Sequence, residues 1–128
     1  MPLVRLSLLR GKSRDHIRAI GDGVQNALIE AFGVPPADRF QIVEQRERED
    51  LIYDPGYLDI QRSDDVVFIT IIASSWRNTD QKKTLYRLIA RNLSENPGLR
   101  PEDVLIVLSP NGMEDWSFGN GLASYVKD

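Results

Sequence analysis

Two stretches decide the fold of this chain: GVPPADRFQIV at Gly33–Val43 and GLRPEDVLIVL at Gly98–Leu108. They lie 98 − 33 = 65 residues apart, and each carries a glycine, a proline and an aspartate at matching positions before an apolar run. The matching aspartates are Asp38 and Asp103. The same offset, applied without gaps, also matches an apolar run and an amphipathic segment upstream of each stretch. A self-match of this length predicts two similar β-α-β halves.

Hydrophobic spacing predicts the elements of each half. A helix capped by Ser13 and ended by Gly33 follows the first strand. A second helix, capped by Thr79 and stopped by Pro97-Gly98, follows the third strand. The third and fourth strands are apolar on both faces, which is typical of buried strands. We expect strands at about residues 3–9, 40–44, 66–73 and 104–108.

The fold class that follows is α/β (α+β), a four-stranded, mainly parallel or mixed sheet with two helices on one face. Asp54-Pro55-Gly56 is a turn signal around which a small hairpin could form. No third helix is available for the other face of the sheet, so a homo-oligomer whose sheets face inward is the economical arrangement. We place the halves of this single domain at about residues 1–44 and 66–108, a polar connector at 45–65 and an arm at 109–128.

The composition of the chain argues against several classes of binding partner and catalytic site. The chain has 128 residues and a formal net charge of −3, which gives no electrostatic argument for binding nucleic acid or anionic membranes. It has no cysteine, and its one histidine, His16, disfavours a zinc site or a Ser-His-Asp triad. No apolar run approaches the roughly 20 residues of a membrane span, and the amino-terminal stretch does not read as a signal peptide. We therefore expect a cytoplasmic protein.

The chain begins with Met1-Pro2, directly before the first apolar strand. An initiator methionine that precedes a small residue such as proline is usually removed, which would leave a secondary amine at the amino terminus. An α-amine has a pKa of about 8 and histidine one of about 6.5, so this amine and His16 are the basic nitrogens able to titrate near neutral pH. In an apolar pocket the pKa of the amine falls further. It could then act as a general base, a general acid or an imine-forming nucleophile.

Four stretches make the chain resemble the tautomerase superfamily and, within it, the malonate semialdehyde decarboxylase group. They are Pro2 with its following strand, AFGVPPADRFQ at Ala31–Gln41, QRS at Gln61–Ser63 and DWSFGNG at Asp115–Gly121. The resemblance covers nearly the whole chain. It implies a β-α-β repeat, a homotrimer, and catalysis by an amino-terminal proline without a cofactor.

The resemblance also assigns roles to individual residues. Pro2 matches the catalytic proline, and Asp38 matches a catalytic aspartate that orients or activates water or hydrogen-bonds the substrate. Trp116 and Phe118 match an aromatic wall of the site. Tyr125 falls where the group often carries another aromatic residue.

The chain departs from the group just beyond its third strand. The group carries two arginines there, one residue apart, which bind the substrate carboxylate, whereas this chain reads Ser74-Ser75-Trp76-Arg77. Arg77 remains, Ser74 or Ser75 replaces the other arginine, and Trp76 stands in the loop as a candidate to close the pocket. A guanidinium offers a planar fork to a carboxylate, so we expect Arg77 to hold the substrate. The loss of one arginine favours a tautomerase over a dedicated decarboxylase.

Two classes of function stay open at this point. The first is an enzyme acting on a small 2-oxo or 3-oxo acid, either by keto-enol tautomerisation of a compound such as phenylpyruvate or by decarboxylation or hydration. The second is a non-catalytic binding module, with a ferredoxin-like plait or a tautomerase fold; an antiparallel central strand pair is expected of the plait. Asp38 also has a structural interpretation, because Asp103 repeats it and both can cap a turn.

Overall fold

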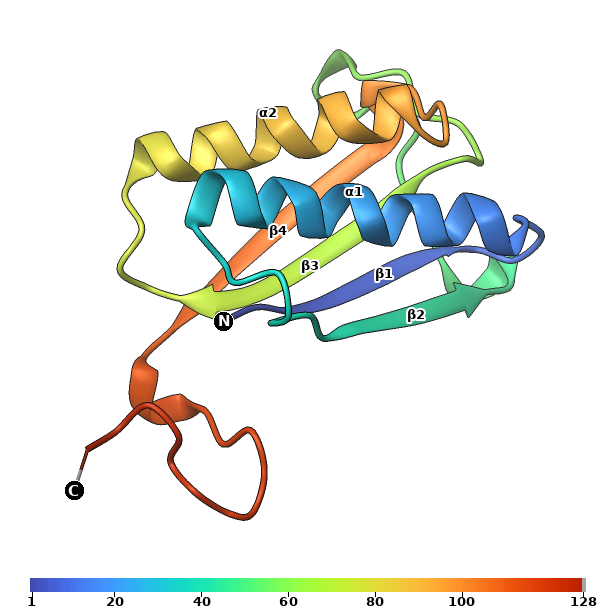
Figure 1. Ribbon diagram of the computed structural model, residues 1–128. Coiled ribbons are helices and arrows are strands. Elements are labelled where there is room, and N and C mark those ends of the chain that lie inside the picture. The colour runs from blue at the N-terminus through green and yellow to red at the C-terminus, as the bar shows by residue number, and fades with distance from the viewer. Residues whose placement is uncertain (128) are drawn as a thin grey trace.

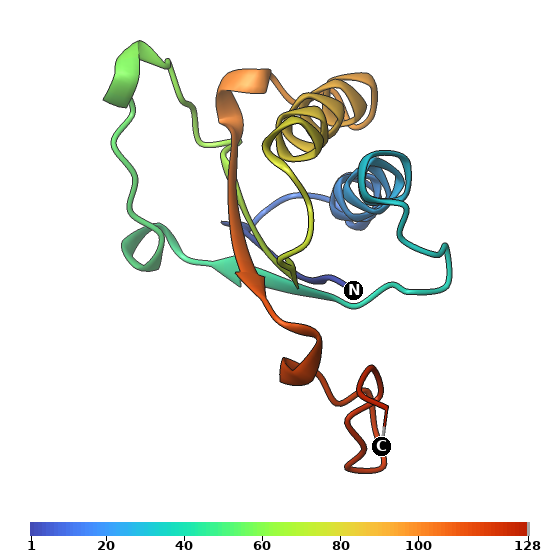
Figure 2. The same cartoon turned by 90° about the vertical axis from the view of Figure 1, so that its left-hand side faces the viewer.

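The computed structural model describes residues 1–127, which form one four-stranded sheet with two long helices on one of its faces (Figures 1 and 2). The strand order is β2-β1-β3-β4, with β1 parallel to β2, β3 parallel to β4, and β1 antiparallel to β3. The predicted mixed sheet with a helix layer on one face is therefore confirmed. The elements are β1 (Leu3–Leu9), α1 (Arg14–Phe32), β2 (Gln41–Arg46), β3 (Val67–Ser74), α2 (Thr79–Glu95) and β4 (Val104–Asn111).

The central strand pair corrects one expectation. An antiparallel centre was expected of the ferredoxin-like plait, yet β1 and β3 pair in this way here. The two folds differ instead in the pairing inside each half. The strands that flank each helix are direct parallel neighbours in this chain, whereas the ferredoxin-like arrangement is a split β-α-β unit. The ferredoxin-like alternative is therefore wrong.

Local side-chain signals set the ends of both helices. The Ser13 hydroxyl caps α1, and Gly33 ends it in the left-handed region at φ 68°, where a side chain would be strained. The cap of α2 is Asn78, one residue before the predicted Thr79. The Asn78 side chain accepts a hydrogen bond from the backbone of Gln81 at 2.8 Å, and the Gln81 side chain accepts one from the backbone of Asn78 at 3.0 Å. This reciprocal capping box fixes the helix start.

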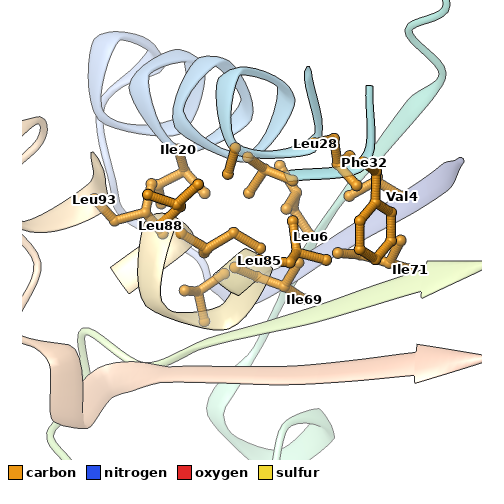
Figure 3. Packing of buried hydrophobic residues seen from close by; sticks show 14 of the residues in the cluster. Val4, Leu6, Ile20, Leu28, Phe32, Ile69, Ile71, Leu85, Leu88 and Leu93 are labelled. Atoms are coloured by element: carbon orange, nitrogen blue, oxygen red, sulfur yellow. The ribbon is translucent and has the colours of Figure 1, made fainter. Parts of the chain in front are cut away.

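The core lies between the helix layer and the sheet (Figure 3). Alternate side chains of β1 and β3, such as Leu6 and Ile69, point toward the helices and meet Ile20 of α1 and Leu85 of α2. All four are at most 1% exposed. Burying a side chain of this size is worth roughly 1.5–3 kcal/mol, so this layer holds the strands in a fixed register.

The opposite face of the sheet is only partly covered. Leu51 of the connector packs with Leu9 and Val66 over one end of it. Elsewhere Ile42 and Val107 are 39% and 49% exposed. A partly covered sheet face that exposes apolar side chains fits burial against other copies of the chain.

The connector and the carboxy-terminal arm contain no strand within residues 47–66 and 112–127. The predicted hairpin is therefore wrong. Arg48 and Tyr53 instead donate hydrogen bonds to the carboxylate of Asp64. These bonds join the beginning and the end of the connector. β4 continues past the predicted end, through Pro110 to Asn111, because an edge strand tolerates a proline. The arm then projects away from the body (Figure 1). No helix in residues 1–127 has the length and apolarity needed to cross a bilayer.

Candidate active site

The candidate site lies at the end of the sheet where β1 begins and β3 ends. Leu3 is opposite Ile72 in the antiparallel pair, so the amino terminus and the loop after β3 share this end. The loop that enters β2 reaches the same place, because the backbone N–H of Val4 donates to the carbonyl of Phe40 at 3.0 Å. Three segments far apart in the sequence, the amino terminus among them, therefore converge at this end of the sheet.

The amino terminus is partly withdrawn from water. Pro2 is buried, and the α-amine of Met1 lies 3.8 Å from Oδ2 of Asp38. Burial is the main effect that lowers the pKa of this amine; Asp38 raises the pKa and the Arg77 cation lowers it. A lowered pKa favours the neutral, basic form of an amine. Removal of Met1 would place that amine on the Pro2 nitrogen.

Asp38 is held by its backbone, whereas its carboxylate accepts no hydrogen bond. Its carbonyl accepts from Nε2 of Gln25 at 3.1 Å, and its N–H donates to the carbonyl of Pro35 at 2.9 Å. Both carboxylate oxygens are buried and have no hydrogen-bond partner among residues 1–127. A buried carboxylate that accepts no hydrogen bond and has only a long ion pair is unfavourable, and a functional role is one explanation for it.

Arg77 is a buried cation enclosed by backbone and aromatic rings. It is 7% exposed and donates from Nη1 to the carbonyl of Ser74 at 3.2 Å and from Nη2 to that of Phe32 at 3.4 Å. Its Cζ atom lies 4.7 Å from the ring centroid of Phe32 and 3.8 Å from that of Trp76. Nε is buried without a partner in the described part of the chain. Burial lowers the pKa of Arg77, and Asp38 opposes that effect.

Phe118 contacts three other aromatic rings and so joins the arm to the entrance of β2. We call these four rings the aromatic stack. Trp116 and Phe118 are nearly parallel, with centroids 5.3 Å apart and an interplanar angle of 5°. Tyr125 meets Phe118 edge-on at 5.1 Å, and Phe40 lies 5.6 Å from Phe118. The sequence analysis did not single out Phe40, although it stands two residues after Asp38 in the AFGVPPADRFQ stretch.

Tyr125 links this aromatic stack to the charged groups. Burial is the main effect that raises the pKa of its hydroxyl, Asp38 raises it further, and Arg77 lowers it. The phenol therefore lies within the electrostatic reach of both side chains. Pro2, Asp38, Arg77 and the predicted aromatic residues thus occupy one end of the molecule.

The two serines of the loop after β3 differ in their surroundings. Ser74 is 5% exposed, and its hydroxyl contacts Sδ of Met113 at 3.6 Å. Ser75 is exposed, and its backbone N–H donates to the carbonyl of Asn111 at 2.8 Å. Asn111, which the sequence analysis also missed, accepts from the indole N–H of Trp116 at 2.8 Å. The end of β4 therefore joins this loop to the aromatic stack.

The site offers an amine, a carboxylate, a guanidinium and aromatic surface. These groups can move a proton, hold a carboxylate and exclude water. Within residues 1–127, no cluster of three or more histidine, aspartate or glutamate side chains could hold a metal ion.

Family models and curated relatives match almost the whole chain. One family described as "Tautomerase enzyme" matches residues 38–119, and a second with the same description matches residues 2–59. The chain is 39% identical over 127 residues to the probable tautomerase YusQ of Bacillus subtilis strain 168, covering 99% of this chain and 100% of that protein. It is 32% identical to the probable tautomerase YrdN of the same organism, covering 98% and 97%.

Solved structures with the same fold include two malonate semialdehyde decarboxylases. One was determined as wild-type, proline-to-alanine and inactivated forms to explain decarboxylase and hydratase activities; it has a TM-score of 0.91 at 34% identity, covering 96% of this chain and 95% of that one. The other, FG41 malonate semialdehyde decarboxylase inhibited by 3-bromopropiolate, has a TM-score of 0.90 at 36% identity, covering 96% and 93%. A trimeric fused 4-OT shares the fold, with a TM-score of 0.78 at 19% identity, covering 96% and 97%. These matches show that the chain belongs to the tautomerase superfamily of enzymes.

Proposed function

We propose that this enzyme acts without a cofactor on a small oxo acid and uses the amine of Pro2, exposed by removal of Met1, to move a proton. The reaction we favour is keto-enol tautomerisation of a 2-oxo acid such as phenylpyruvate. The observation that supports it best is the convergence of the amino terminus, the Asp38 carboxylate, which accepts no hydrogen bond within residues 1–127, and the buried cation of Arg77.

Each group has a defined part in this proposal. Arg77 binds the substrate carboxylate. The neutral amine of Pro2 accepts the proton of the enol hydroxyl, and the protonated amine then delivers a proton to C3. The C2=C3 double bond becomes a single bond, C3 gains a C–H bond, and the C2–O bond becomes C=O. Asp38 stabilises the ammonium between these two steps. Phe118 and its stacked neighbours would contact an apolar substituent on C3.

Decarboxylation or hydration of a 3-oxo acid is the second candidate, supported by the similarity to the two decarboxylases. In that reaction the amine stays protonated and polarises the carbonyl, while Asp38 assists water. The loop after β3 contributes one arginine, Arg77, rather than two, which is why we place this reaction second.

We further propose that the enzyme works as a homotrimer in the cytoplasm. The partly covered sheet face and the projecting arm are the surfaces that other copies would bury. Sedimentation equilibrium tests the assembly, since a trimer has three times the 14.5 kDa mass of the chain. A monomeric mass at micromolar concentration would contradict the proposal.

The direct test of the reaction is ketonisation of phenylpyruvate enol, followed by absorbance. Pro2→Ala should lower the rate by about 10²- to 10⁴-fold, the range for loss of a positioned acid-base group. Pro55→Ala, in the exposed connector, is the matched control and should leave the rate unchanged. Equal rates for Pro2→Ala and the unaltered enzyme would refute the amine mechanism. An intact-mass spectrum shows independently whether Met1 is removed.

A further inference from the structure

Trp76 is an exposed aromatic residue that covers a buried cation. The indole is 59% exposed, whereas the neighbouring Arg77 is 7% exposed. The Cζ atom of Arg77 lies 3.8 Å from the centroid of Trp76, closer than the 4.7 Å to the Phe32 ring. An arginine over the face of a tryptophan is a favourable cation-π contact, which strengthens when water is excluded.

The loop that carries Trp76 is anchored at both ends. Ser75 is tied to β4 through its backbone N–H, and the capping box at Asn78 fixes the start of α2. Arg77 folds back beneath the loop to reach the carbonyl of Ser74. Since both ends are held, the indole is confined over the guanidinium on the side that faces solvent.

The hydrogen bonds of Arg77 explain why its orientation matters. Nη1 and Nη2 each donate to a backbone carbonyl, and Nε is buried without a partner among residues 1–127. A guanidinium is a rigid planar group, so any rotation of the group changes the direction of all of its N–H bonds at once. The rings of Trp76 and Phe32, which both contact the guanidinium, restrict that rotation.

We propose that Trp76 is a positioning residue that holds the guanidinium of Arg77 for a substrate with one carboxylate and an apolar body. This inference rests on the proposed function, because it assigns Trp76 to the same site. Beside the guanidinium of Arg77 the loop presents the exposed indole of Trp76, so it offers one cation and an apolar surface. The substrate class that fits this pair is an aryl- or alkyl-bearing 2-oxo monocarboxylate.

Steady-state kinetics test this assignment. Trp76→Ala should raise KM for phenylpyruvate enol about tenfold and change kcat less than about twofold, because carboxylate binding is the same in ground and transition states. Trp76→Phe should restore most of the affinity. Tyr86→Ala, on the outer face of α2, is the control and should leave KM unchanged. In an Arg77→Ala background, Trp76→Ala should have no further effect on KM, whereas additive effects would overturn the coupling.

A binding measurement keeps this test independent of turnover. The chain has two tryptophans, so Trp116→Phe leaves Trp76 as the fluorescent group. Titration with phenylacetate should change its emission saturably, and Arg77→Ala or the uncharged analogue phenylacetamide should abolish the response. A response without catalysis would refute the proposed function and leave the role of Trp76 standing. No response to phenylacetate would overturn the inference whether or not the enzyme turns over.

Discussion

The two ends of the sheet are built from the same elements and differ in what their polar groups contact. When the two halves of the sequence are aligned by the 65-residue offset, each position of the candidate site matches a position at the opposite end of the sheet. Pro2 matches Val67, Asp38 matches Asp103, and Arg77 matches Lys12.

At the opposite end, the charged side chains of Asp103 and Lys12 both have partners within the fold. Asp103 is 0% exposed and accepts hydrogen bonds from the backbone N–H of Ser63 at 2.6 Å and its hydroxyl at 2.8 Å. Lys12 pairs with Asp65. These contacts link the connector to β4 and to the loop after β1, and they are structural.

At the candidate site, the corresponding groups are left available. The Asp38 carboxylate has no hydrogen-bond partner among residues 1–127, and neither does Nε of Arg77. The repeated aspartate therefore has two different uses: Asp103 ties segments together through its side chain, whereas the Asp38 turn is held through its backbone. This contrast supports a functional role for Asp38 over the turn-capping alternative.

The largest expected difference is between Asp38→Ala and Asp103→Ala. Asp38→Ala removes the carboxylate that stabilises the protonated amine and should lower kcat by about 100-fold or more. The free energy of unfolding should change little, because the Asp38 carboxylate accepts no hydrogen bond within residues 1–127 and its ion pair with the amino terminus is long, at 3.8 Å. Asp103→Ala should lower the free energy of unfolding by about 1–3 kcal/mol, because the Ser63 N–H loses its acceptor. Its folded fraction should keep normal kcat.

Urea denaturation and steady-state kinetics on both variants measure these effects. If Asp38→Ala destabilises the protein as much as Asp103→Ala and keeps its kcat, then Asp38 is a second structural aspartate. The comparison between the two ends would then carry no information about the site.

The fold could be predicted from the sequence because its signals are local and repeated. Apolar strand runs, helix periodicity and the Gly-Pro-Asp pattern each recur at the same offset and identify both halves. The orientation of the central strands could not be deduced, because periodicity does not specify which strands from the two halves become neighbours. The start of α2 was one residue off because Asn78 and Thr79 can both cap, and the bond to Gln81 decides between them.

The site was only partly predictable. The convergence of Pro2, Asp38 and Arg77 followed from the repeat and from the family resemblance. The absence of a partner for Asp38 and the contact of Trp76 with Arg77 depend on side-chain packing, which no local pattern encodes. Phe40 was missed because an apolar residue entering a strand is ordinarily interpreted as core.

A smaller effect separates Arg77→Lys from Lys12→Arg. A lysine is a point charge that cannot reproduce the planar contacts of Arg77 with two carbonyls and two rings, so KM should rise about tenfold with little change in kcat. Lys12→Arg keeps the charge opposite Asp65 and should leave KM unchanged. Initial rates over a range of substrate concentrations measure both. A KM that is equally sensitive at the two positions would indicate that Arg77 acts through general electrostatics.

The smallest expected effect is on the pH dependence of kcat/KM, whose acid limb reports the pKa of the basic amine in the free enzyme. Asp38 raises the pKa of the amino terminus and Arg77 lowers it. A base is active when unprotonated, so a lower pKa extends activity to lower pH. The residual activity of Asp38→Asn should therefore show an acid limb at lower pH, and that of Arg77→Ala one at higher pH. Asp103→Asn and Lys12→Ala, their counterparts at the other end, should leave the limb in place. Shifts in the same direction for both site variants would mean that the amine of Pro2 is not the titrating base.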